Sequence, residues 1–273
     1  MPASEWIRRY PDPMTTPAGD AEPDELPEAP EQENRHAFSM WLSRAIVAPL
    51  VRMIYRPIIE GKQNVPKKGA VILASNHMSF IDSIAIPVAS PRQVHFLAKS
   101  SYFEGTGLKG WASRTFFTAV GASPVRRGAG QAALDALDQH QKMLEEGLAV
   151  ALYPEGTRSL DGRLYKGRTG VAFLALQTGA KVVPVGLIGT NEAMPVGASM
   201  PKREPRVRVR FGEPIDVSHY GPASSGKARR LATDAIMAAI HELSGQELAG
   251  VYNEPPAQNP IDRIKQALPH ERR

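Results

Sequence analysis

The chain has 273 residues, enough for one large α/β domain with its own hydrophobic core or for two small domains. It contains no cysteine, which excludes a disulfide framework, a thiolate nucleophile and a cysteine-based metal site. The formal net charge is +5 at pH 7, but residues 1–35 are strongly acidic, so the rest of the chain is basic. A basic body favours an anionic partner, such as a phosphate ester, an acidic lipid surface or a nucleic acid, and charge alone does not choose between them.

The first segment, residues 1–35, is predicted to be a disordered acidic tail. It contains seven prolines and few apolar residues, so it buries too little surface to offset the entropy lost on folding. It also lacks the basic start and apolar core of a secretory signal peptide.

Residues 36–60 are predicted to form an amphipathic helix. Apolar side chains recur at helical spacing on one face, with Pro49 inside the segment and Arg44 and Arg52 among them. A membrane-spanning helix needs about 20 predominantly apolar residues, and an arginine near its centre costs about 2.5–3.5 kcal/mol on insertion, so spanning is disfavoured. The helix can instead lie in the headgroup layer of a membrane or pack on the domain core, and the pattern alone leaves both open.

Residues 61–247 are predicted to form a single α/β domain. Short apolar runs alternate with helical patterns, which is typical of a mostly parallel sheet flanked by helices. The predicted strands cover residues 69–76, 94–98, 148–155, 181–190 and 206–212, and the predicted helices cover residues 131–147, 167–179 and 227–244. The strand at 206–212 alternates arginine with apolar residues, so we expect it at an edge or with one face exposed. Residues 248–273 are predicted to be a loose tail.

Polar residues follow the first predicted strand, in the stretch SNHMSFIDS at residues 75–83. Reactive groups gather beyond the carboxyl ends of strands in open α/β sheets, and His77 falls there. Asp82 lies five residues further on, so the two side chains meet only if the backbone turns between them. In that arrangement the carboxylate holds one imidazole nitrogen while the other takes a proton from an alcohol. The alternative is structural, because Ser79 and Asp82 also fit a capping box that starts a helix.

A second motif, YPEGTRS at residues 153–159, follows another predicted strand and is expected at the same edge of the sheet. Glycine allows a tight turn with close approach, and arginine offers a planar fork of donors that suits phosphate oxygens. The candidate binding residues of this turn are Glu155, Gly156, Thr157 and Arg158. The alternative interpretation is an ordinary turn with a surface salt bridge.

A third segment, VGASPVRRG at residues 120–128, adds Arg126 and Arg127 after two turn-forming residues, Gly121 and Pro124. These arginines are candidates for a second contact with an anion. A solvated basic loop is the alternative interpretation of this segment.

Together these segments resemble the motifs of the lysophosphatidic acid acyltransferase (1-acyl-sn-glycerol-3-phosphate acyltransferase) family of glycerolipid acyltransferases. The family signature N-H-x4-D is matched by Asn76, His77 and Asp82. A glycine followed six residues later by arginine is matched by Gly121 and Arg127. The third family motif, F/Y-P-E-G-T-R-S, is matched in full, and the apolar-Pro-apolar motif is matched by residues 183–185.

The resemblance, which covers residues 38–220, implies transfer of a fatty acyl group from a thioester to the free hydroxyl of a lysophospholipid. The expected reaction converts lysophosphatidic acid to phosphatidic acid in phospholipid biosynthesis. The resemblance implies that His77 is the general base and that Asp82 orients it. It also implies that Arg127 and Arg158 bind the acceptor phosphate. Glu155 is expected to orient the glycerol hydroxyl or Arg158, and the groups around Gly156 and Thr157 are candidates for contacts with the substrate.

The expected co-substrate is acyl-CoA or an acyl carrier protein thioester, with no bound cofactor and no metal. Lys99 and Lys166 are possible further phosphate contacts, although a solvated surface charge is the favoured interpretation of each. A lipid substrate favours the membrane-interface interpretation of residues 36–60, and we expect a peripheral or monotopic enzyme on the cytoplasmic face of the cell membrane. Nucleic acid is not an expected partner, because no module of aromatic and basic residues accompanies the charge.

Two alternatives remain open from the sequence. The acceptor could be glycerol 3-phosphate or another lysolipid, or the protein could be a non-catalytic membrane lipid-binding protein. The retention of His77, Asp82, Glu155 and Arg158 together argues against the second alternative. No motif predicts the donor carrier, the preferred acyl chain length, the acylated position or the oligomeric state.

Overall fold

The structure is a computed structural model that describes residues 45–46, 48–125, 131–198 and 200–254. At its centre is a five-stranded sheet with the strand order β1-β8-β7-β2-β5. The strands are β1 (Ile58–Glu60), β2 (Val71–Ser75), β5 (Ala149–Leu152), β7 (Lys181–Ile188) and β8 (Arg208–Phe211). β2 pairs in parallel with both β5 and β7, and β1 pairs in parallel with β8, whereas β7 and β8 are antiparallel. The predicted mostly parallel sheet is confirmed.

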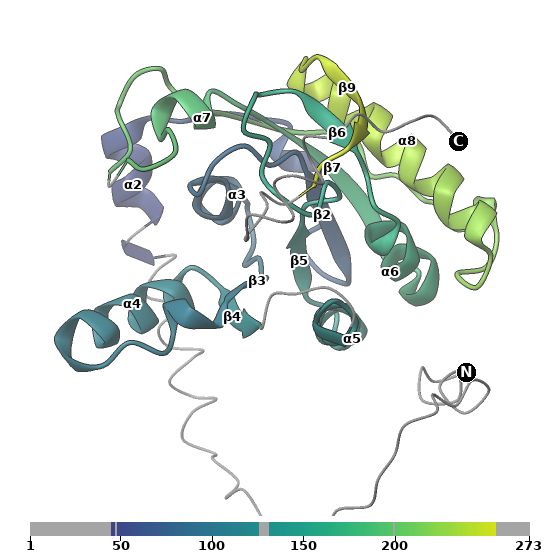
Figure 1. The fold of residues 1–273 in the computed structure, drawn as a ribbon, viewed down its shortest axis with the longest axis horizontal. Coiled ribbons are helices and arrows are strands. Elements are labelled where there is room, and N and C mark those ends of the chain that lie inside the picture. The colour runs from purple at the N-terminus through teal and green to yellow at the C-terminus, as the bar shows by residue number, and fades with distance from the viewer. Residues whose placement is uncertain (1–44, 47, 126–130, 199, 255–273) are drawn as a thin grey trace, which may run out of the picture.

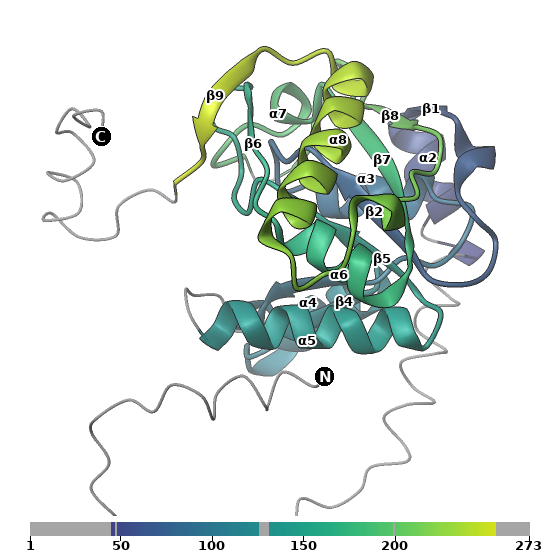
Figure 2. The ribbon, with the colours of Figure 1, turned by 90° about the vertical axis from the view of Figure 1, so that its right-hand side faces the viewer.

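Helices cover both faces of this sheet, as Figure 1 shows. On one side lie α2 (Ala48–Tyr55), α3 (Asp82–Ala89) and α4 (Gly107–Ala119), and on the other lie α5 (Gln131–Glu145), α6 (Gly170–Thr178) and α8 (Gly226–Ser244). The short elements are α7 (Thr190–Ala193), η4 (Lys62–Asn64), η5 (Ser100–Tyr102) and η6 (Ser218–Tyr220). Two small parallel sheets complete the fold, β3 (Phe96–Lys99) with β4 (Ala122–Val125) and β6 (Leu164–Lys166) with β9 (Leu248–Tyr252). Figure 2 shows β6 and β9 side by side near α8.

The inner strand β2 packs against a hydrophobic core on each face of the sheet. Val71 and Leu73 pack in the cluster that contains side chains of α3 and α4, while Ile72 and Ala74 pack in the cluster that contains side chains of α6 and α8. A strand covered on both faces carries apolar residues at every position, and every residue of β2 is buried. The end of β2 therefore has a fixed position against both layers.

Two segments differ from the prediction, residues 58–60 and residues 248–252. The strand at Arg208–Phe211 has one buried face and one partly exposed face, as expected. The edge position belongs to β1, which lies in the segment predicted to be helical. The described part of that helix ends at Tyr55. Leu248–Tyr252 forms a strand, although residues 248–273 were predicted to be a tail. The predicted tail at 1–35 lies outside the described residues.

None of the helices in the described part of the chain is both long and apolar enough to cross a membrane.

Candidate active site

His77 and Asp82 meet just beyond the end of β2. The chain turns after Ser75, and His77 Nδ1 lies 2.8 Å from Asp82 Oδ2 at the first turn of α3. The same carboxylate oxygen accepts hydrogen bonds from the backbone N–H groups of Met78 at 2.7 Å and Ser79 at 2.8 Å. Asp82 is fully buried. The backbone turn that the five-residue spacing required is therefore present.

Only half of the capping-box alternative is present, because Asp82 accepts the backbone N–H of Ser79 but the Ser79 hydroxyl does not bond the start of the helix. The residue before α3 is Ile81, which makes no side-chain capping hydrogen bond. The Ser79 hydroxyl donates instead to the carbonyl of Met194, at 2.8 Å. Asp82 thus orders the loop and contacts the imidazole with one oxygen.

The contact with Asp82 fixes the tautomer of His77. A carboxylate can only accept hydrogen bonds, so Nδ1 carries the proton and donates it to Asp82. The lone pair of a neutral imidazole then lies on Nε2, which no described residue hydrogen-bonds. Such a nitrogen can accept a proton from a substrate.

Tyr153 holds the plane of the His77 ring. The two rings stack with centroids 3.8 Å apart and planes 11° apart. The Tyr153 hydroxyl is 2.9 Å from Ser83 Oγ, which lies next to Asp82 on α3. The first residue of YPEGTRS therefore contacts both the histidine and the helix that carries its carboxylate partner.

Glu155 has a different position from the one expected. Its carboxylate is fully buried, with Oε1 accepting the backbone N–H of His77 at 2.9 Å and Oε2 accepting that of Tyr165 at 3.0 Å. Burial raises the pKa of Glu155 to about 7, against the effect of these two hydrogen bonds. Both oxygens face backbone amides, so in this structure Glu155 orders the site instead of contacting Arg158.

The rest of YPEGTRS forms a tight turn against the His77 loop. Gly156 has φ +79° and donates its N–H to the carbonyl of Tyr153 at 3.0 Å. The N–H of Ser159 donates to the carbonyl of His77 at 2.7 Å. Arg158 is exposed, and among the described residues none forms an ion pair with its guanidinium. The turn therefore presents a positive charge beside the histidine.

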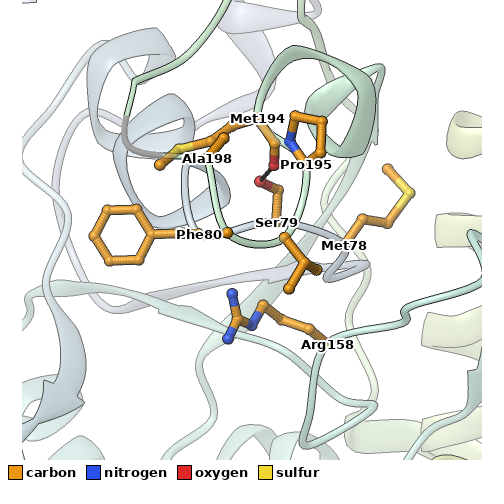
Figure 3. Close-up of a pocket in the computed structure, with 9 residues that line it drawn as sticks. Met78, Ser79, Phe80, Arg158, Met194, Pro195 and Ala198 are labelled. Carbon is orange, nitrogen blue, oxygen red and sulfur yellow. Dashed lines mark hydrogen bonds between the residues drawn. The ribbon is translucent and has the colours of Figure 1, made fainter.

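A cleft of about 270 Å³ opens next to this turn, as Figure 3 shows. In that view Arg158 extends along one side of the cleft, across from Met194 and Pro195. The lining residues are Met78, Ser79, Phe80, Arg158, Met194, Pro195, Val196, Gly197 and Ala198. His77 is not among them, although its neighbour Met78 is. The cleft combines apolar walls with one cationic side chain.

Asn76 connects the end of β2 to β7. Its Nδ2 donates to the carbonyl of Leu187 at 2.9 Å, and its Oδ1 accepts the N–H of the same residue at 2.8 Å. Nδ2 also donates to Gln246 Oε1 at 2.8 Å. The sequence motif included Asn76 but gave it no role, and Gln246 gave no signal because it is distant in sequence.

The remaining candidate residues are two arginines and two lysines. Arg126 and Arg127 lie outside the described residues. Lys99 is the last residue of β3, and Lys166 is exposed at the end of β6 and does not line the cleft. Within the described ranges, no group of three or more histidine or acidic side chains is arranged to hold a metal ion.

Comparisons with known proteins agree with the motifs. Residues 56–188 match the family model described as Acyltransferase. A chloroplastic 1-acyl-sn-glycerol-3-phosphate acyltransferase of Arabidopsis thaliana is 31% identical over 182 residues, covering 66% of this chain and 49% of that protein. A 1-acyl-sn-glycerol-3-phosphate acyltransferase of Chlamydomonas reinhardtii is 33% identical over 201 residues, covering 73% of this chain and 56% of that protein. The chain thus spans about half the length of these relatives.

A solved structure shares the fold. The crystal structure of the 1-acyl-sn-glycerophosphate acyltransferase of Thermotoga maritima matches with a TM-score of 0.54 and 23% sequence identity. The match covers 78% of this chain and 88% of that chain. At this identity the likeness shows the fold alone. The matched motifs, the family model and relatives at about 30% identity together identify residues 56–188 as a domain of the Acyltransferase family.

Proposed function

We propose that this protein is a 1-acylglycerol-3-phosphate O-acyltransferase that converts lysophosphatidic acid to phosphatidic acid in phospholipid biosynthesis. The observation that carries the proposal is the buried His77–Asp82 pair, 2.8 Å apart, beside a turn that exposes Arg158. Relatives that bear this name and match about two thirds of the chain support the choice of acceptor.

The proposed chemistry is direct transfer. His77 Nε2 accepts the proton of the acceptor hydroxyl as its oxygen attacks the thioester carbonyl. The new ester C–O bond forms, the C–S bond breaks, and the proton passes from the imidazolium to the departing thiolate. Asp82 stabilises the imidazolium, and proton transfer of this kind contributes typically about 10²–10⁴ in rate. An acyl-enzyme intermediate is not invoked, because the chain has no cysteine and no G-x-S-x-G motif.

The acceptor phosphate is proposed to bind Arg158. A guanidinium without an ion-pair partner among the described residues is available for bidentate bonds to phosphate oxygens. Arg127 is proposed as a second contact on the strength of its motif. Met78, Phe80 and Met194 give the cleft apolar walls that suit the hydrocarbon part of the same substrate.

We also propose that the enzyme works as a peripheral or monotopic protein on the cytoplasmic face of the cell membrane. The lipid substrates reside there, and two helices of the same layer carry apolar side chains in solvent. Met53 of α2 is 69% exposed, and on α4 Leu108 is 80% and Trp111 is 59% exposed. Basic residues add about 1 kcal/mol each near an anionic surface.

The test is thiol release from oleoyl-CoA and release of carrier protein from oleoyl acyl carrier protein, each with lysophosphatidic acid or glycerol 3-phosphate. His77→Ala is compared with His219→Ala, a matched control at an exposed histidine on η6. The proposal expects release that depends on lysophosphatidic acid and vanishes only in His77→Ala. Faster release with glycerol 3-phosphate would reassign the acceptor. No release from either donor would refute acyl transfer to these acceptors and favour a lipid-binding role.

A further inference from the structure

The chain after α8 forms a segment that we call the C-terminal strap, Gln246–Asn253. Its strand β9 pairs in parallel with β6, with Leu248 opposite Leu164 and Tyr252 opposite Lys166. Most side chains of β9 point to solvent, and Leu248 and Val251 are 58% and 56% exposed. Burial of apolar surface therefore contributes little to the stability of this strand, and polar contacts at its two ends attach it to the domain.

The two ends of the strap carry polar side chains that reach the candidate active site. At the first end, Gln246 Nε2 donates to the carbonyl of Gly162 at 2.7 Å while its Oε1 accepts from Asn76. At the second end, Asn253 is only 9% exposed, and its Nδ2 donates to the carbonyl of Thr157 at 3.4 Å. The strap thus contacts the residue before His77 and the residue before Arg158.

Arg168 adds a second connection between the strap and the turn. Its Nη2 donates to the carbonyl of Asn253 at 3.1 Å, and its guanidinium lies 5.9 Å from the centre of the Tyr252 ring. Its backbone N–H donates to the carbonyl of Pro154 at 2.7 Å. Its side chain packs so closely on Gly156 that a Cβ atom there would lie 3.1 Å from Cδ and Nε. Arg168 therefore contacts the turn at Pro154 and Gly156, next to the contact of Asn253 with Thr157.

We propose that the C-terminal strap positions the YPEGTRS turn, and that Asn253 is a positioning residue for the binding of acceptor phosphate by Arg158. The phosphate part of the inference rests on the proposed function. Asn253 bonds the peptide group that joins Thr157 to Arg158, so this bond limits rotation of the peptide from which the arginine side chain projects. The strap lies outside the family match, which ends at residue 188.

The first experiment compares Asn253→Ala with Val251→Ala in the full chain. Val251 is a matched control, because it lies two residues earlier in the same strap with an exposed side chain. One hydrogen bond corresponds to a factor of roughly 5 in binding. Asn253→Ala should therefore raise the apparent KM for lysophosphatidic acid roughly 5-fold. The KM for the acyl donor should stay at its Val251→Ala value. Equal increases for donor and acceptor, or no increase, would overturn the inference.

A double-mutant cycle separates positioning from a general structural effect. If Asn253 acts through Arg158, then in the Arg158→Ala background the further change Asn253→Ala should leave the acceptor KM unchanged. A full additional increase in that background would show that Asn253 acts by another route, and the assignment would be withdrawn.

A measurement without turnover keeps the inference separate from the proposed function. The N–H groups of Gly156 and Ser159 are hydrogen-bonded in the turn, so hydrogen exchange at these amides reports its order. Exchange there should be faster in Asn253→Ala than in Val251→Ala, with β7 unchanged. If the wild-type protein transfers no acyl group, the proposed function fails, and exchange alone decides whether the strap orders the turn. Unchanged exchange would overturn the strap inference even in an active enzyme.

Discussion

The buried carboxyl of Glu155 should make the stability of the protein depend on pH. Its pKa is about 7 in the folded protein, against an ordinary value of 4.5, because burial disfavours the charged form. In the interval from 4.5 to 7 the folded state keeps a proton that the unfolded state has lost, so stability falls as pH rises. A difference of about 2.5 pKa units corresponds to roughly 3 kcal/mol.

The assay is urea denaturation followed by circular dichroism, at a series of pH values from 4.5 to 8, for the wild type and Glu155→Gln. Glutamine does not ionise, so subtracting its unfolding free energy removes contributions from other groups, including His140, whose pKa is lowered by burial to about 4. The wild-type value minus the variant value should fall by roughly 3 kcal/mol across this range. Glu213→Gln, at an exposed position, should give a constant difference.

A constant difference for Glu155→Gln as well would refute this reasoning. It would mean that the two backbone N–H groups that Glu155 accepts keep it ionised throughout, and that hydrogen bonding outweighs burial. A difference that rises with pH would contradict the sign as well as the size.

Three further predictions concern the site and the proposed membrane surface. Asp82→Asn should lower kcat by roughly 10²–10⁴ with little change in acceptor KM, because it removes the charge that stabilises the imidazolium; steady-state assays at saturating donor test this. Tyr153→Phe keeps the stack on His77 and should lose about 1 kcal/mol of stability with its bond to Ser83, whereas Tyr153→Leu should also lower kcat; a kcat unchanged in both would contradict a role for stacking. Trp111→Glu should weaken sedimentation with anionic vesicles while Leu231→Glu on α8 does not, and equal binding would argue against contact through α4.

The main sheet could be predicted because its inner strands β2 and β7 are buried on both faces. The runs VILAS in β2 and KVVPVGLI in β7 are almost continuously apolar, and such short runs predict buried strands without knowledge of distant residues. The meeting of His77 and Asp82 could also be predicted, since it depends on a turn of five residues within one loop. These features are local in sequence.

Other features escaped prediction because they depend on distant partners or weak local signals. Helix α4 starts with glycine, contains Gly110 and has aromatic and β-branched residues in its second half, all of which have low helix propensity. Strand β9 carries mostly exposed side chains and is defined by its pairing with β6, more than 80 residues earlier in the chain. Glu155 accepts hydrogen bonds from the backbone N–H groups of His77, in the loop after β2, and of Tyr165 in β6. No sequence motif links these two positions.

The side chain of Asn76 imitates a peptide group. By offering one acceptor and one donor to Leu187, it adds one more rung to the pairing of β2 with β7 without using its own backbone. The backbone of the next residue, His77, is thereby released from the sheet, and its N–H and carbonyl bind Glu155 and Ser159 instead. A primary amide of this length supplies both the donor and the acceptor of this pair of hydrogen bonds. An isosteric aspartate has no donor, so the Leu187 carbonyl would lose its bond, and the backbone of the His77 loop would then compete for it instead of bonding in the turn.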